Sequence, residues 1–213
     1  MISHVLTVVL NELNSHMDST YGNNSQKPQA ALGNLAEGFA MTAGSPGLDR
    51  NTIYLSIVNI SEESALKNTP NHVVDSSKLT AVFENPPVFL NFKILLAATH
   101  SNYNDAILML SRAIRFFQYR NVFTRENVDP SSISDGQPLN PIDRIETFKL
   151  IFDLYSASME EVNHMWGTLG GKQYPFVLYR MRMLDLKFKS VQDEMPLIKE
   201  VIRDLSHLTT SSA

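Results

Sequence analysis

The chain has 213 residues, of which 43% are hydrophobic, a length and composition that allow one sizeable hydrophobic core. Its 18 basic and 22 acidic residues form no basic block, which excludes the basic surface that non-specific nucleic-acid binding needs. Cysteine is absent, so disulfides, a thiolate nucleophile and cysteine-ligated zinc are also excluded.

The N-terminal segment predicts an amphipathic helix. Apolar residues recur at three- and four-residue spacing over residues 2–17, with polar residues on the other side. A signal peptide is not indicated, because no basic residues precede the segment and Asn11 and Glu12 interrupt it. No other stretch approaches the roughly 20 apolar residues of a membrane span. We therefore expect a soluble protein that assembles in the cytoplasm, with a polar loop over residues 19–29.

Two strands and a second helix are predicted next. Residues 51–60 and 87–98 are rich in β-branched and aromatic residues, and the second segment alternates apolar with polar side chains. The residues between these strands give mixed signals and could form a short helix or strand. The second helix is predicted from residue 103 to about residue 118, with Asn102 as its cap.

A long loop and a further strand follow. Residues 127–141 are the longest turn-forming stretch, and a loop of that length in a compact domain is usually functional or disordered. Residues 144–155 alternate again and predict a strand. Its buried face is predicted to contain Phe148, Leu150, Phe152 and Leu154.

A third helix is predicted between Ser158 and the pair Gly170 and Gly171. Ser158 and Glu161 match the S-x-x-E capping box, and the two glycines can adopt the left-handed conformation that ends a helix. The stretch GTLGGK superficially resembles a phosphate-binding loop, but it follows a helix where that motif precedes one. We therefore interpret it as a helix stop. Trp166 is predicted to pack in a core.

Evidence for a chemical site is weak. Glu161 and His164 have the spacing of one half of a bundle-type metal site, but the chain has one copy of this motif, and Glu161 is already explained as a capping residue. No catalytic, cofactor-binding or metal-binding residue is therefore predicted.

Arginines are the best candidates for an interface. A strand predicted to begin at residue 176 has Arg180 and Arg182 on one face. These two side chains are either solvated or pair with carboxylates across a subunit interface, and arginines of the second helix pose the same question. The candidate interface residues are Arg180, Arg182, Arg112, Arg115 and Arg120. The tail after Pro196 is ambiguous: its Val and Ile would suit an edge strand, but a helix over residues 197–205 fits better.

Two long blocks of the sequence resemble a known family. They are NPPVFLNFKILLAATHSNYNDAILMLSRAIRFFQYRNVFTREN at residues 85–127 and EEVNHMWGTLGGKQYPFVLYRMRML at residues 160–184. The N-terminal helix, LGN at 32–34 and IVNISEE at 57–63 are similar to the same family. Over roughly residues 1–187 the chain resembles the tail-terminator or cap proteins of extracellular contractile injection systems. These are phage-tail-like particles of the antifeeding-prophage and virulence-cassette type.

The resemblance implies an α+β fold. It predicts one tail-terminator-like domain over residues 1–190, with a mainly antiparallel or mixed sheet flanked by three or four helices. The C-terminal segment over residues 191–213 is expected from its own residue pattern to be helical, with a disordered end. The resemblance also implies a homohexameric ring that closes the distal end of the inner tube and contacts the last layer of the sheath, with no catalytic residue or cofactor. Strand faces and the loops 19–29 and 127–141 are the expected contacts with tube and sheath proteins.

Two alternatives stay open at this point. The chain could instead be a baseplate, tube-initiating or tail-completion component of such a particle. It could also be a small metal-dependent hydrolase that uses Glu161 and His164.

Overall fold

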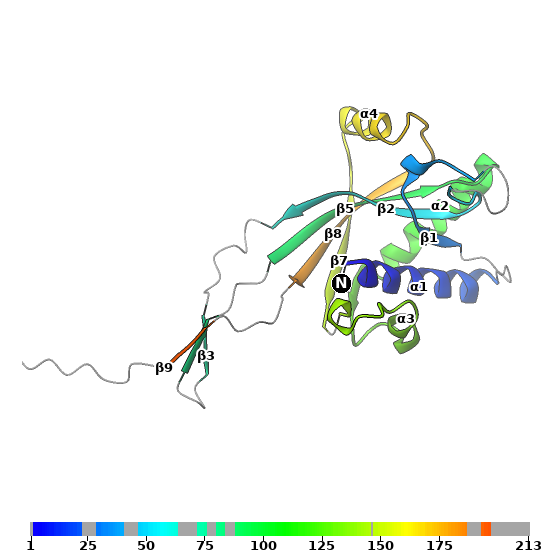
Figure 1. Cartoon of the computed structure of the whole chain (residues 1–213). Coiled ribbons are helices and arrows are strands. Elements are labelled where there is room, and N and C mark those ends of the chain that lie inside the picture. The colour runs from blue at the N-terminus through cyan, green and yellow to red at the C-terminus, as the bar shows by residue number, and fades with distance from the viewer. Residues whose placement is uncertain are drawn as a thin grey trace, which may run out of the picture. The chain divides into compact units, whose positions relative to one another are not determined.

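The computed structural model describes residues 2–22, 29–40, 47–63, 72–75, 80–83, 88–145, 147–186 and 193–196. The chain divides into two compact units. The large unit comprises Met1–Lys67 and Val88–Leu186, and the small unit comprises Asn68–Pro87 and Lys187–Ala213. The large unit confirms the predicted α+β class, with a mixed sheet flanked by helices (Figure 1).

The described part of the large unit contains four α-helices and six strands. The helices are α1 (Ile2–Tyr21), α2 (Tyr103–Tyr119), α3 (Pro130–Ser134) and α4 (Met159–Thr168), with 3-10 turns at Leu35–Glu37 and Pro141–Asp143. The strands are β1 (Ala30–Leu32), β2 (Ile53–Glu62), β5 (Val88–Ala98), β6 (Val122–Thr124), β7 (Lys149–Tyr155) and β8 (Phe176–Leu186). They form one sheet in the order β1-β2-β5-β8-β7-β6, in which β1 is parallel to β2 and all other neighbours are antiparallel.

The small unit contains a three-stranded antiparallel sheet. Its strands, in the order β3-β4-β9, are β3 (His72–Asp75), β4 (Thr80–Phe83) and β9 (Asp193–Pro196). The segment between the two early predicted strands therefore contains strands. The helix predicted over residues 197–205 lies outside the described residues, and the predicted division of the chain at residue 190 stays a prediction.

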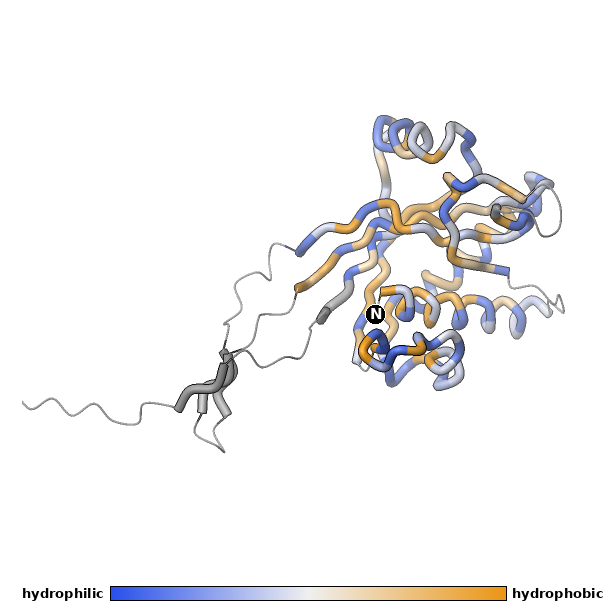
Figure 2. Tube along the Cα trace, viewed as in Figure 1, coloured by the Kyte–Doolittle hydropathy of each residue, from blue (hydrophilic) through white to orange (hydrophobic). Residues whose placement is uncertain are grey.

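One face of the six-stranded sheet packs against α1 and α2, and we call it the helix face. The side chains of Phe92, Ile94 and Leu96 are fully buried there, which confirms the alternation predicted for β5. Hydrophobic residues are concentrated along these strands and on α1 (Figure 2). Of the four residues predicted for the buried face of residues 144–155, Phe148, Leu150 and Phe152 are buried. Leu154 is instead 62% exposed, because β6 pairs only with Lys149–Ile151 and leaves Leu154 at the edge of the sheet.

The predicted loop over residues 127–141 contains α3. Asp129 caps this helix and Pro130 occupies its first turn, so residues that favour turns here begin a helix. The Asn11 side chain on α1 donates hydrogen bonds of 3.1 Å to the main-chain oxygens of Ser132 and Asp135. The stretch is therefore packed on α1 and is not a plain loop.

His4 joins α1 to the same stretch. Its ring accepts a hydrogen bond from the Ile145 N–H on Nδ1 (3.2 Å) and donates from Nε2 to the oxygen of Ile133 (2.9 Å). Helix α1 also extends to Tyr21, beyond its predicted end. The predicted polar loop therefore begins later than expected, at Gly22, and residues 23–28 of it lie outside the described residues.

Candidate assembly surface

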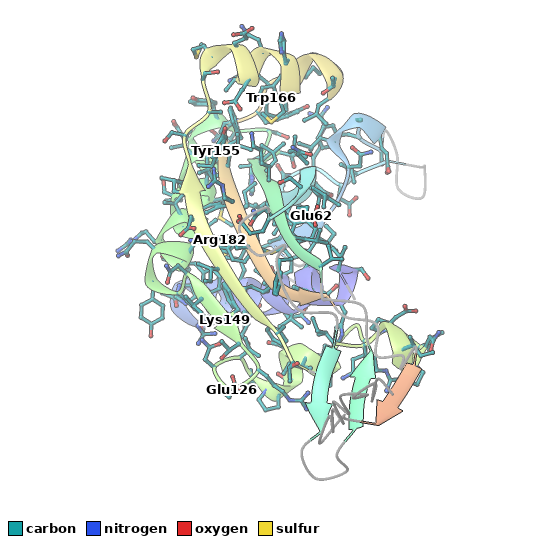
Figure 3. All side chains as sticks on the ribbon, turned by 90° about the vertical axis from the view of Figure 1, so that its left-hand side faces the viewer. Glu62, Glu126, Lys149, Tyr155, Trp166 and Arg182 are labelled. Carbon is teal, nitrogen blue, oxygen red and sulfur yellow. The ribbon has the colours of Figure 1, made fainter. Side chains whose placement is uncertain are left out.

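The other face of the sheet, which we call the open face, is covered by α4 and the turn Leu35–Glu37 at one end. There, Trp166 and Met165 of α4 pack on Leu95 and Leu178 of the sheet. Trp166 is 4% exposed, which confirms its predicted place in a core. Farther along the strands no described helix covers this face, and Arg182 and Lys149 lie on it (Figure 3).

The sequence of α4 fixes where this helix begins and ends. The Ser158 hydroxyl accepts the N–H of Glu161 at 3.2 Å, and the Glu161 carboxylate accepts the N–H of Ser158 at 3.0 Å, so the predicted capping box is present. Gly170 and Gly171 have φ values of 95° and 76°, and the Gly171 N–H bonds to the Trp166 oxygen at 2.8 Å. GTLGGK is therefore a helix stop, as predicted.

Glu161 also anchors α4 to the open face. Its Oε1 accepts hydrogen bonds from the Tyr155 hydroxyl (2.8 Å) and from Lys93 Nζ (3.1 Å). The bond from the Ser158 N–H, followed by those from Tyr155 and Lys93, lowers the pKa of Glu161 from 4.5 to about 2. The bond to Tyr155 raises the pKa of Lys93, against the effect of burial. One carboxylate thus serves both as a cap and as a tie between helix and sheet.

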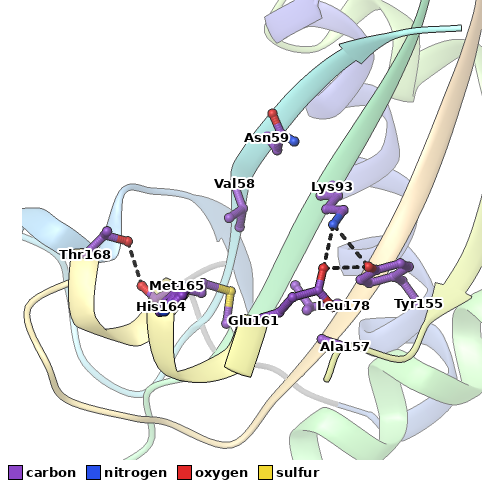
Figure 4. A pocket seen from close by; sticks show the side chains of 10 residues that line it. All are labelled: Val58, Asn59, Lys93, Tyr155, Ala157, Glu161, His164, Met165, Thr168 and Leu178. Atoms are coloured by element: carbon purple, nitrogen blue, oxygen red, sulfur yellow. Dashed lines mark hydrogen bonds and ion pairs between the residues drawn. The ribbon is translucent and has the colours of Figure 1, made fainter. Parts of the chain in front are cut away.

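A cavity of about 310 Å³ lies between α4 and the sheet (Figure 4). Val58, Met165 and Leu178 supply apolar walls, and Glu161 and His164 lie on its polar side. The two residues of the possible metal motif therefore line one cavity, but the oxygens of Glu161 already accept three hydrogen bonds. Among the described residues, no group of three histidine or acidic side chains is placed to hold a metal ion.

The arginines of β8 have different surroundings. Arg182 Nη2 lies 2.5 Å from Asp153 Oδ2 on β7, so this guanidinium has a carboxylate partner in its own chain. Arg180 lies directly opposite Lys93 in the sheet, and its guanidinium is 5.6 Å from the centre of the Tyr155 ring. No carboxylate of the described residues forms an ion pair with Arg180. It is therefore the arginine of this face best placed to bind an acidic partner.

The arginines of α2 do not join this surface. Arg120 forms an ion pair with Glu12 of α1, and the Arg112 guanidinium stacks 4.2 Å above the Tyr21 ring. Arg115 is exposed and makes no ion pair with the described residues. The five candidates thus divide between the open face and α2, which packs on the helix face. Their role at a subunit interface stays a prediction.

Sequence reasoning missed the contacts that join distant segments. Nothing in the sequence around Lys93 indicates Glu161 as its partner, because 68 residues separate them. Sequence reasoning also missed the contacts of Glu12, which interrupts an apolar run in the sequence but is buried in the structure.

Acid is expected to loosen the contact between α4 and the sheet. The folded-state pKa of Glu161 lies below its ordinary value of 4.5, so its ionised form stabilises the fold. This contribution is fully present above about pH 4.5 and is lost as the pH falls towards 2. Trp166, the one tryptophan of the chain, packs between α4 and the sheet, and its fluorescence emission should shift to the red in that range.

Glu161→Gln is the matched control, because glutamine keeps the capping-box acceptor and does not titrate. The difference in Trp166 emission between this variant and the wild type should be present above pH 4.5 and vanish near pH 2. A difference that does not depend on pH would contradict the assignment.

Comparison with solved structures finds two similar folds. The chain is similar to the sheath/tube terminator of an extracellular contractile injection system, PVC, in the extended state, with a TM-score of 0.54 and 13% identity over 95% of this chain and 65% of that chain. It is also similar to the tube-terminating cap of the anti-feeding prophage, with a TM-score of 0.53 and 13% identity over 92% of this chain and 60% of that one. The chain thus spans less than two thirds of the length of these two proteins.

The family assignment rests on the sequence. A comparison with curated proteins finds no match. None of the described helices combines the length and apolar character needed to cross a membrane. Residues 4–200 match the family model described as the Pvc16 N-terminal domain, in agreement with the resemblance found in the sequence. The chain therefore belongs to the Pvc16 N-terminal domain family.

Proposed function

We propose that this chain is a terminator of a contractile injection system. In this role it forms a homohexameric ring that closes the distal end of the inner tube and contacts the last layer of the sheath. The observation that carries the proposal is the family match over residues 4–200, together with a fold shared with a sheath/tube terminator and a tube-terminating cap. The role is structural, and the protein is assembled in the cytoplasm as part of an extracellular or cell-bound particle.

The open face supports a role in contact with other proteins. A terminator must cover the exposed subunit surfaces of a tube end so that polymerisation stops. A sheet with part of one face left uncovered by the described helices suits this task, and Arg180 has no carboxylate partner among the described residues. We infer that the open face binds acidic side chains of the tube or sheath protein, because an arginine at an interface pairs with carboxylates in a bidentate geometry.

Electron microscopy of particles made without this chain tests the role. Loss of a terminator should give tubes of uncontrolled length or unstable sheaths, because nothing stops polymerisation. A complete absence of particles would instead indicate a baseplate or tube-initiating component and would contradict the proposal. Normal particles of uniform length would also contradict it.

Reversing the charge of the open face is expected to abolish assembly. The double variant Arg180→Glu with Arg182→Glu should fold normally, because both side chains are exposed, but should no longer assemble with tube protein. Size-exclusion chromatography with light scattering measures the assembly, and circular dichroism checks the fold. Lys172→Glu makes the same kind of charge change in the exposed turn after α4 and should assemble normally. Unchanged assembly of the double variant would show that the open face is not the contact surface.

A further inference from the structure

The six-stranded sheet has two open edges. β1 pairs with the first three residues of β2, so no described strand pairs with the outer side of β2 over residues 57–60. At the other side, β6 pairs with the first three residues of β7, so no described strand pairs with the outer side of residues 153–155. Unpaired strand edges attract further strands.

The main chain of β2 presents hydrogen-bonding groups outward. The residues Ile53 and Leu55 bond towards β1, since the Ile53 N–H donates to Gln29 and the Leu55 oxygen accepts from Gly33. Alternation along the strand directs the groups of Ile57 outward as well. A bulge follows Ile57 and shifts this alternation by one residue. The Glu63 N–H then donates inward to Phe89, so the groups of Ile60 also face outward.

Both edges also present apolar side chains on the helix face. The residues Ile57, Ile94, Tyr179 and Leu154 form one row across the sheet by direct pairing. The inner two are buried, whereas Ile57 is 38% exposed and Leu154 is 62% exposed. Ile60, which follows Ile57 on the same face, is 49% exposed. The hydrophobic row is thus buried in the middle of the sheet and exposed at both of its edges.

The directions of the two edges are complementary. Three antiparallel steps separate β2 from β7, so the two strands run in opposite directions. If the β7 edge of one copy met the β2 edge of another, the strands would pair antiparallel and the sheet pattern would continue. β1 and β6 block opposite ends of the two edges, so neighbouring copies must be displaced along the strand direction, as closed sheets require. Two different edges make a head-to-tail contact, and such a contact forms a ring when the rotation between successive copies closes.

From these observations we infer that the β2 edge of one copy pairs with the β7 edge of a second copy. The contact places Ile57 and Ile60 of one copy beside Leu154 of the next, on the same face of a continuous sheet. This inference rests on the proposed ring and names the surfaces that form it.

Engineered disulfides test this contact, because the chain contains no cysteine. Full-length Leu154→Cys is mixed with Ile57→Cys or with Ile60→Cys and oxidised. We expect a disulfide-linked dimer on non-reducing gels in at least one mixture and its loss in each variant alone. Within one chain, Ile57 and Leu154 are three strand spacings or about 14 Å apart, too far for a disulfide. Asn59→Cys, which pairs with Lys93 and so lies on the open face, is the matched control and should not link to Leu154→Cys.

Each outcome decides the inference. Linkage of Ile57→Cys or Ile60→Cys to itself would indicate a two-fold contact between β2 edges and would overturn it. No linkage in either mixture also overturns it, and light scattering of the same samples then separates two cases. A ring-sized species leaves the proposed function standing with another interface, whereas a monomer even with tube protein present contradicts the proposed function as well. If Ile60→Lys abolishes binding to tube protein and leaves the ring intact, the edge belongs to the tube contact.

Discussion

Phe117→Ala is expected to lower the free energy of unfolding by about 3–5 kcal/mol. The Phe117 ring is 2% exposed, and its centre lies 4.9 Å from the ring centres of both Phe152 and Tyr179. These contacts join α2 to two neighbouring strands of the sheet. Removing the ring leaves a cavity on the helix face that the surrounding aromatic side chains cannot fill without leaving their own contacts.

Urea unfolding followed by circular dichroism measures this loss. Tyr119→Ala is the matched control, because it removes an aromatic ring from the same helix where the side chain is 77% exposed. It should change the free energy of unfolding by less than about 0.5 kcal/mol. A similar cost for both variants would mean that the aromatic cluster does not hold α2 on the sheet.

Glu12→Ala is expected to lower the free energy of unfolding by about 2–3 kcal/mol, which is less than the roughly 3–5 kcal/mol for a fully buried ion pair. Glu12 is 8% exposed and accepts hydrogen bonds from the Asp129 N–H at 2.7 Å and from Arg120. The change leaves both donors without this partner. Arg120 is 30% exposed, so water replaces part of what its guanidinium loses.

Two further variants show whether the contacts of Glu12 cause the effect. Glu12→Gln retains an acceptor for the Asp129 N–H and should lose less stability than Glu12→Ala. Asp18→Ala removes an exposed carboxylate from the same helix and should be nearly neutral. Equal losses for Glu12→Ala and Asp18→Ala would show that the buried pair does not contribute. Chemical unfolding curves with equal slopes are needed for this comparison.

Local signals account for the parts of the fold that the sequence predicts well. The strand β5 follows from alternation alone, since Phe92 and Ile94 face a core while Lys93 does not. The ends of α4 follow from Ser158 and Gly170, because capping depends on residues within a few positions of the helix end. In such cases the partners of each group are its near neighbours in the chain.

The rest depends on segments that are far apart in the sequence. The residues that begin α3 also favour turns, and its packing on α1 cannot be read from either segment alone. The arginines of the candidate site show the same dependence on distant segments. Sequence placed Arg182 and Arg180 on one face correctly, but it could not distinguish the one that pairs with Asp153 from the one that does not.

The contacts of α1 with the stretch around α3 also bear on synthesis of the chain. His4 and Ile133 are 129 residues apart, and Asn11 and Ser132 are 121 apart. At translation rates of about 5–20 residues per second, α1 waits on the order of ten seconds before these partners leave the ribosome. During that time His4 and Asn11 lack these hydrogen-bond partners, and α1 lacks the stretch that packs on it. The N-terminal helix is therefore a segment that a nascent-chain chaperone would be expected to shield.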